Sequence, residues 1–432
     1  MTPHFHISRR RFLKTTALVS ASLGIPKWFV EEAEAARRHT NKLGPNDKPG
    51  IAWIGCGNRG RVISKDAAKH GEMRMICDVD DAHLAIGQKE HPNAKPCKDF
   101  RQILERDDIH VIVNSTPDHW HTLINIAAVN AGKDVYSEKP LTLTIDEGRH
   151  LVRAVDKTKR ILQTGSQQRS DKRFRHACEL VRNGRIGKLK HIMASIPTGP
   201  HQGPFATAPV PAGLDWNMWQ GQTPAIDYVP ERCHHSFRYW FEYSGGMMTD
   251  WGAHHNDIAQ WATGSERTGP VEIDGKSLVA MIPGGYTTAS QFRVEYTYAN
   301  GVKLTCKDSA PDNSPNGVTF EGTDGWIFVS RKEIKASNPD LLTQPLPASA
   351  VRLYHSENHM QNFFDCVRSR KAPICEAEIG HRSVSVCHLG VLSMRLGRKL
   401  KWDPKNEKFV DDKEANKWLA REMRKPFDYS IT

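Results

Sequence analysis

The chain has 432 residues, of which 25% are charged and 38% hydrophobic, and its formal net charge is +11. A chain of this length predicts two domains, and no apolar run approaches the ~20 residues of a membrane-spanning helix. The lysines and arginines are scattered, without a basic helix or an aromatic-interleaved stripe, so we expect no nucleic-acid partner. The 9 cysteines form no CxxC pair and predict neither a disulfide framework nor a zinc site.

Residues 1–35 predict an export signal. Residues 8–14 read SRRRFLK, and the mildly apolar stretch Thr16–Ile25 is too short to span a bilayer, as is typical of a signal-peptide core. The pattern resembles the bacterial twin-arginine signal, with small residues of a cleavage site at Ala33 and Ala35. We expect the twin-arginine translocase to export the folded protein to the periplasm or the outer face of the membrane. The alternative, a basic amphipathic helix, explains the charges but not the Ser/Phe/Leu/Lys spacing.

A glycine turn follows the first predicted strand. The buried-strand pattern runs into the sequence GCGNRG, after which apolar residues recur at helical spacing. In such a unit Gly55 makes the tight turn, Gly57 lets the backbone approach a pyrophosphate, and Gly60 lets the helix pack on the strand. A second predicted strand ends at Asp78, whose carboxylate suits the adenosine ribose hydroxyls of NAD and would repel the extra phosphate of NADP. NAD is therefore the expected cofactor, and NADP is less favoured.

The two halves of the chain show different patterns. Strands and helices alternate over residues 48–168, which predicts an α/β domain with a doubly wound parallel sheet, the Rossmann fold. Over residues 169–432 hairpin signals appear, the strongest at Asn300–Gly301 between two alternating runs. We expect an α+β substrate domain with a large, open, mostly antiparallel sheet. An uncovered sheet face would favour a homo-oligomer, a dimer or tetramer.

Several motifs begin where predicted strands end. TPDHWH occupies residues 116–121 and EKP residues 138–140, while QTGSQQR at 163–169 and DWGAHHND at 250–257 lie further along the chain. Together with the glycine turn, they resemble the Gfo/Idh/MocA family of oxidoreductases, of the glucose-fructose oxidoreductase and inositol 2-dehydrogenase type. The resemblance implies a nicotinamide cofactor, a sugar or cyclitol substrate, and a set of site residues.

The resemblance and the glycine turn place these residues by position. The predicted cofactor site comprises Gly55, Gly57, Asn58, Arg59, Gly60, Asp78, Ser115, Thr116, Pro117, His121, Glu138 and Arg169. The predicted substrate site comprises Lys139, Arg169, Trp240, Asp250 and His254. Lys139, Asp250 and His254 are the predicted catalytic residues.

Oxidation of a secondary alcohol needs an acceptor for the hydroxyl proton. Asp250, His254 and Asp257 are spaced i, i+4, i+7, which places them on one helix face, so that Asp250 could fix the His254 tautomer. We predict that His254 is the acid/base and that Lys139 orients the reacting hydroxyl. Without the family resemblance, a surface ion pair or a core histidine would be the better interpretation of such a pair.

Metal ligation is conceivable for Cys233, His234, His235, His254 and Asp257. No spacing of a catalytic zinc site such as HExxH occurs, however, and we predict no metal.

Three functions compete. The first is an NAD(P)-dependent oxidoreductase acting on a sugar or cyclitol, with a tightly bound cofactor. The second is an NAD-dependent glycoside hydrolase or lyase that acts by transient oxidation and elimination, as some members of the wider family do. The third, a non-catalytic carbohydrate-binding protein, predicts damaged catalytic positions, which this sequence does not show.

Overall fold

The computed structural model describes residues 48–310 and 312–431. The predicted export signal lies outside these residues. Within them, no helix combines the length and the apolarity that a bilayer crossing requires.

The first sheet has six strands in the order β3-β2-β1-β4-β5-β6, and every pair is parallel. The strands are β1 (Gly50–Ile54), β2 (Glu72–Cys77), β3 (Lys95–Cys97), β4 (Val111–Asn114), β5 (Asp134–Ser137) and β6 (Leu162–Thr164). The intervening helices are α3 (Asn58–Ala67), α4 (Asp81–Glu90), α5 (Arg101–Leu104), α6 (Asp118–Asn130) and α7 (Ile145–Thr158). β1, β4 and β5 are buried along their whole length, as expected of strands covered by helices on both faces. The predicted Rossmann sheet is confirmed.

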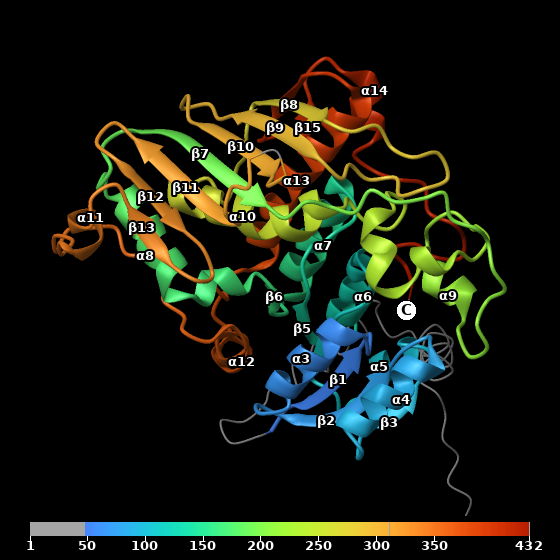
Figure 1. The fold of residues 1–432 in the computed structure, drawn as a ribbon. Helices are drawn as coiled ribbons and strands as arrows, with labels where there is room; N and C mark the ends of the chain where they lie inside the picture. The colour runs from blue at the N-terminus through green and yellow to red at the C-terminus, as the bar shows by residue number, and fades with distance from the viewer. Residues whose placement is uncertain (1–47, 311, 432) are drawn as a thin grey trace, which may run out of the picture.

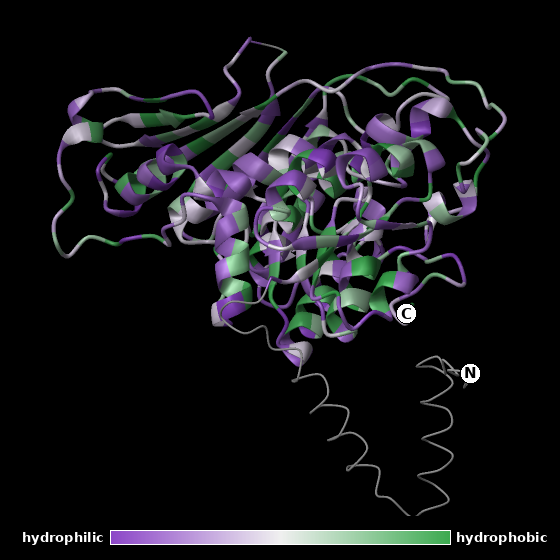
Figure 2. Cartoon of the chain, turned by 90° about the horizontal axis from the view of Figure 1, so that it is seen from below, coloured by the Kyte–Doolittle hydropathy of each residue, from purple (hydrophilic) through white to green (hydrophobic). Residues whose placement is uncertain are grey.

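The second sheet has nine strands in the order β13-β12-β11-β7-β10-β9-β8-β14-β15. Its strands are β7 (Leu189–Ile196), β8 (Glu272–Ser277), β9 (Phe292–Thr297), β10 (Lys303–Asp308), β11 (Gly317–Gly322), β12 (Trp326–Val329), β13 (Ile334–Ala336), β14 (Leu400–Asp403) and β15 (Lys408–Phe409). β7 and β10 are parallel, and the other pairs are antiparallel. Buried residues of β9 alternate with half-buried or exposed ones, the pattern of a sheet with one face on the core, and Figure 2 shows hydrophilic and hydrophobic residues interspersed along the chain. The predicted mostly antiparallel sheet is confirmed.

Among the described residues, the second half contains seven helices, two of which pack between the two sheets. The helices are α8 (Lys172–Arg182), α9 (Trp216–Gln220), α10 (Met247–Thr263), α11 (Asp340–Thr343), α12 (His359–Ser369), α13 (Ala377–Leu396) and α14 (Lys413–Lys417), with 3₁₀ turns η1 (Gln167–Ser170), η2 (Pro230–Arg232) and η3 (His234–Tyr239). α10 and α13 lie between the large sheet and the Rossmann domain (Figure 1). α12 instead completes the core of the first domain, because Met360, Phe363 and Phe364 pack with Ile51 and Trp53. The C-terminal half therefore supports both sheets.

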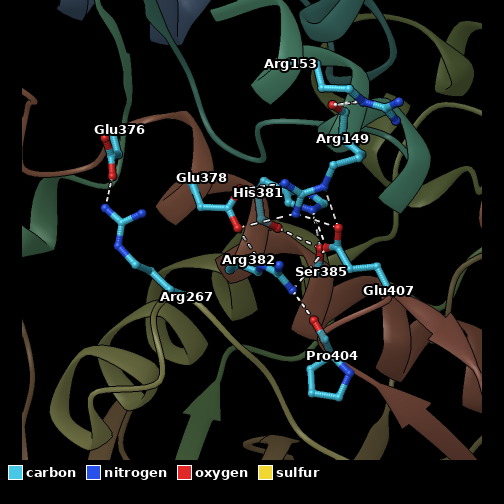
Figure 3. Close-up of polar contacts among 10 residues, drawn as sticks. All are labelled: Arg149, Arg153, Arg267, Glu376, Glu378, His381, Arg382, Ser385, Pro404 and Glu407. Atoms are coloured by element: carbon cyan, nitrogen blue, oxygen red, sulfur yellow. Dashed lines mark hydrogen bonds and ion pairs between the residues drawn. The ribbon is translucent and has the colours of Figure 1, made fainter. Parts of the chain in front are cut away.

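A charged network joins the two domains (Figure 3). Arg149 of α7 contacts Glu378 at 2.8 Å and Glu407 at 2.5 Å. Glu407 also accepts a hydrogen bond from the fully buried His381 at 2.6 Å. Burial would raise the pKa of Glu407, but its hydrogen bonds with His381 and Arg149 lower that pKa to about 2. The network fixes α7 of the first domain against α13 of the second.

Gly148→Ala should weaken this interdomain contact. A Cβ atom at residue 148 would lie 1.9 Å from His381 Nδ1, and Glu407 holds that imidazole in place. We expect the free energy of unfolding to fall by about 1–3 kcal/mol, the usual cost of overpacking, even though alanine favours a helix. Chemical denaturation measures the change. The control is Gly269→Ala, whose Cβ would meet no atom closer than 3.7 Å; equal stabilities of the two variants would contradict the prediction.

Candidate active site

A cavity of about 450 Å³ opens at the carboxyl edge of the first sheet, where the segment around α9, η3 and the start of α10 covers it. Ligands of open α/β sheets bind at this edge. The cavity is lined by Ile54, Gly55, Gly57, Asn58, Arg59, Cys77, Asp78, Val79, His83, Lys98, Phe100, Ser115, Thr116, Pro117, Asp118, Trp120, His121, Ile124, Glu138, Lys139, Pro140, Met218, Trp219, His234, His235, Phe237, Arg238 and Asp250. Both domains therefore contribute to its wall.

The glycine turn has the geometry that a dinucleotide needs. Gly55 has φ +88°, and a Cβ on Gly60 would lie 2.2 Å from the Gly55 carbonyl oxygen, so neither position tolerates a side chain. A Cβ on Gly57 would meet nothing closer than 3.9 Å, which leaves the approach to the turn open. No side chain caps the N-terminus of α3, so its amides remain for a phosphate. Ser115 supports the turn by donating a 2.8 Å hydrogen bond to the Gly55 carbonyl.

Asp78 lies at the end of β2, as predicted, and faces the cavity. Its carboxylate accepts hydrogen bonds from the backbone amides of Cys56 at 2.7 Å and Asp80 at 3.0 Å. These contacts fix the carboxylate beside the glycine turn, where a ribose would lie. The turn and this acidic group together fit the adenosine half of NAD.

The two motif loops are joined by one histidine. His121 is buried, with Nδ1 2.7 Å from the Pro140 carbonyl and Nε2 2.8 Å from the Thr116 carbonyl. Burial lowers its pKa, although these contacts oppose the shift. A neutral imidazole donates to one of these carbonyls only. His121 therefore holds the two loops together at the cavity wall rather than presenting a free nitrogen.

Glu138 also lies at this wall, where its carboxylate accepts hydrogen bonds from Arg59 at 2.8 Å and from Gln167 at 3.1 Å. Gln167 was not predicted. It belongs to the segment that connects the two domains.

An ion pair between the domains faces the cavity. The Lys139 ammonium contacts the Asp250 carboxylate and donates to the Asp250 carbonyl at 3.1 Å. Arg238 Nε lies 3.5 Å from the second carboxylate oxygen. Burial would raise the pKa of Asp250, but Lys139 and Arg238 outweigh that effect and lower it. Asp250 is therefore ionised at neutral pH.

The predicted hydrogen bond between Asp250 and His254 is wrong. His254 follows one turn later on α10, but its Nδ1 has no hydrogen-bond partner among the described residues. The Asp250 carboxylate turns instead toward the two cations, which attract it more strongly than a neutral imidazole would. Burial, and next the charges of Lys139 and Arg331, lower the pKa of His254 well below its ordinary value. His254 is thus a neutral, buried imidazole close to Lys139 and outside the cavity lining.

Two predicted binding residues have structural roles instead. Arg169 is 1% exposed and forms two hydrogen bonds with Asp257, at 2.7 and 2.8 Å, so its guanidinium is not free for cofactor or substrate. Asp257, predicted to share a face with Asp250, points to this internal pair. Trp240 is 2% exposed in an aromatic cluster, and its indole donates to the Glu231 carbonyl at 2.8 Å.

The structure adds residues that sequence reasoning missed. Trp219, Phe237 and Arg238 line the cavity from the second domain, and Asp118 lines it from the first turn of α6. Asp118 is buried and accepts a hydrogen bond from Ser244. Burial raises its pKa to about 7, although Ser244 opposes the shift. Its position inside the TPDHWH motif was the signal that could have revealed it.

The first domain has a parallel sheet, a glycine turn and a cavity-facing carboxylate at the end of β2, and the second domain completes the cavity. These features define a two-domain dinucleotide-binding protein. Two family models match the chain: the oxidoreductase family's NAD-binding Rossmann fold over residues 50–166 and that family's C-terminal alpha/beta domain over residues 200–429. The chain belongs to the Gfo/Idh/MocA oxidoreductase family, and the cofactor of its first domain is NAD.

Curated relatives are distant. A glycosyl hydrolase family 109 protein of Shewanella sp. (strain W3-18-1) is 27% identical over 212 residues, which cover 43% of this chain and 45% of that relative. The uncharacterized oxidoreductase YrbE of Bacillus subtilis is 26% identical over 292 residues, covering 66% of this chain and 72% of YrbE. The chain thus spans less than half the length of the first of these relatives.

Solved structures share the fold. WlbA dehydrogenase from Bordetella pertussis, in complex with NADH and UDP-GlcNAcA, has a TM-score of 0.63 at 17% identity over 82% of this chain and 99% of that one. Levoglucosan dehydrogenase, in complex with NADH and levoglucosan, has a TM-score of 0.62 at 17% identity over 82% and 99%. The aldose-aldose oxidoreductase from Caulobacter crescentus, complexed with glycerol, has a TM-score of 0.62 at 19% identity over the same shares. At these identities the likeness establishes the fold alone.

Asp118→Asn should change how stability depends on pH. The folded pKa of about 7 lies above the ordinary carboxyl value near ~4, so folding takes up a proton between these pH values. Wild-type stability from this group is present below about pH 4 and is lost as pH rises through 7. Asparagine imitates the neutral form and can still accept a hydrogen bond from Ser244. We therefore expect the free energy of unfolding of the variant, relative to that of wild type, to rise by ~3 kcal/mol between pH 5 and 8. Denaturant unfolding at each pH measures the difference, and a flat difference would contradict the assignment.

Proposed function

We propose that this protein uses NAD to transfer hydride to or from a secondary hydroxyl of a sugar or cyclitol. The observation that carries the proposal is the ion pair of Lys139 with Asp250, which joins the two domains at the cavity beside the glycine turn. The fold shared with WlbA and levoglucosan dehydrogenases supports the choice of a sugar substrate.

We assign the steps of the proposed reaction to different residues. When NAD is bound, its nicotinamide accepts or returns the hydride. Lys139, held by Asp250, donates a hydrogen bond that orients the reacting hydroxyl. His254 is the proposed acceptor of the hydroxyl proton because it is neutral and its Nδ1 lacks a partner. Asp118 is the alternative acceptor, since its pKa of about 7 suits proton transfer near neutral pH.

The wall from the second domain suits a sugar ring. Trp219 and Phe237 bring aromatic side chains to the cavity, and aromatic faces pack well against the apolar faces of sugars. Arg238 adds a hydrogen-bond donor beside them.

We propose further that the protein is exported through the twin-arginine pathway with NAD already bound. Free NAD is scarce outside the cytoplasm, so a second substrate would regenerate the cofactor in place. A homo-oligomer remains our expectation.

A second candidate is a glycoside hydrolase or lyase that oxidises its substrate transiently, eliminates the leaving group and restores the hydride. The similarity to glycosyl hydrolase family 109 proteins favours it. Lys139 and His254 would serve in the same positions. A non-catalytic carbohydrate-binding protein is disfavoured because the charged pair is intact.

The two enzymatic functions differ in net redox change. Purified protein is incubated with free sugars and with aryl glycosides while nicotinamide absorbance and leaving-group release are recorded together. We expect free sugars to change the redox state of the bound nucleotide. Release of the leaving group without a net change in absorbance would favour the hydrolase. If neither signal appeared with any sugar, both enzymatic functions would be excluded.

Lys139→Met should abolish chemistry but not cofactor binding. The variant keeps the glycine turn and Asp78 but loses the ammonium that orients the hydroxyl, so we expect turnover to fall at least ~100-fold. NAD affinity, measured by calorimetry, should change less than about threefold, and circular dichroism checks the fold. The matched control is the exposed Lys157→Met, which should retain full turnover. Unchanged turnover of Lys139→Met would remove Lys139 from the mechanism.

A further inference from the structure

Three potential metal ligands meet at one end of the cavity. Within residues 48–310 and 312–431, Asp80, His83 and His234 form the group of histidine, cysteine and carboxylate side chains whose ligand atoms all lie within 4.8 Å of one another. Asp80 and His83 belong to the start of α4, and His234 begins η3 in the second domain. The three ligands therefore bridge the two domains.

We propose that Asp80, His83 and His234 form a binding site for a divalent metal ion of the zinc class. Two imidazoles and one carboxylate make a usual zinc ligand set, with one position left open. His234 Nε2 already lies 3.0 Å from Asp80 Oδ2, and the centroids of the two imidazole rings are 4.2 Å apart. Ligand atoms of a tetrahedral zinc lie about 3.3 Å apart, since each is ~2.0 Å from the metal. The ligand atoms lie up to 4.8 Å apart here, so side-chain rotations that draw them closer would complete the site.

Each ligand is presented by a defined contact. Asp80 caps α4 by accepting from the Ala82 amide at 2.8 Å through Oδ1, which leaves Oδ2 turned toward His234. Asp78 Oδ2 lies 3.7 Å from His83 Nδ1, so a second carboxylate stands beside that imidazole, as the outer partners of metal-binding histidines do.

The backbone at His234 supports a functional role. Its φ of +49° lies in the left-handed region, which is costly for a residue with a side chain. In this conformation the imidazole Nε2 lies 3.0 Å from Asp80 Oδ2. Both imidazoles keep partial exposure, 24% and 38% of their side chains, so an ion can reach them.

A metal ion at this site would affect the binding of NAD, because the site lies at one end of the same cavity. His83 and His234 line the cavity together with Asp78, at the end where we place the adenosine ribose. An ion held there would tie the segment at 233–234 to the first domain and slow the exchange of NAD. This consequence rests on the proposed function, whereas metal binding itself does not.

The test is a zinc titration of the metal-stripped full-length protein, without nucleotide or substrate and without an affinity tag. Wild type should bind one Zn²⁺ that His83→Ala and His234→Ala each weaken at least tenfold by calorimetry. Asp80→Asn keeps the helix cap and should weaken the same site, which guards against loss by misfolding. The matched control is His235→Ala, the neighbouring cavity histidine outside the group, which should bind as wild type does.

Two results would overturn the proposal: the absence of saturable binding in wild type, or equal zinc affinity in wild type, His83→Ala and His234→Ala. An ordinary hydrogen-bonded pair between His234 and Asp80 would produce the first. Because no nucleotide is present, either result leaves the oxidoreductase proposal untouched, and failure of that proposal leaves the zinc titration untouched.

Discussion

The cavity depends on the pairing of Lys139 with Asp250, two residues 111 positions apart in the chain. One follows β5 of the first domain, and the other lies in the first turn of α10 of the second. The two side chains are only 14% and 22% exposed, and a charge largely removed from water is destabilising without a partner, so each domain needs the other to keep its own charge at this place. The site therefore exists only when the domains are docked.

Docking in turn rests on contacts at the cavity wall and beyond it. At the wall, His121 fixes the loop that holds Lys139 by contacting the carbonyl of the next residue, Pro140. Arg169 and Asp257 hold α10 two turns beyond Asp250, and the network of Arg149, Glu378, His381 and Glu407 holds α7 against α13 (Figure 3). The position of the ammonium relative to the glycine turn is thus set by packing between domains.

Features that depend on neighbouring residues in the sequence were predicted correctly. The parallel sheet of residues 48–168, the glycine turn and Asp78 lie where the alternation of strands and helices predicts them. Helical spacing predicted which face of α10 carries Asp250. It could not predict the partners of the Asp250 carboxylate, because Lys139 and Arg238 come from distant segments of the chain. The prediction that Arg169 binds cofactor and substrate was wrong for the same reason, since its partner Asp257 is 88 residues away. A spacing motif could not reveal the group of Asp80, His83 and His234, because two ligands lie near residue 80 and the third near residue 234.

The cavity region contains two kinds of polar group: ion-paired groups that orient a substrate, and groups that can accept a proton. Lys139 and Arg238 lie against the Asp250 carboxylate and lower its pKa, so this carboxylate stays charged. A group that stays charged can hold and orient a substrate but is poorly suited to exchange protons. The same positive charge of Lys139, after burial, keeps His254 neutral, while burial brings Asp118 to a pKa of about 7. A proton acceptor must begin in its deprotonated form, which the lowered pKa gives His254, and it works best with a pKa near the working pH, which Asp118 has. The charge of Lys139 disfavours the protonated form of both His254 and Asp118, so it helps each group to begin as a base while burial sets the pKa of Asp118 near neutrality.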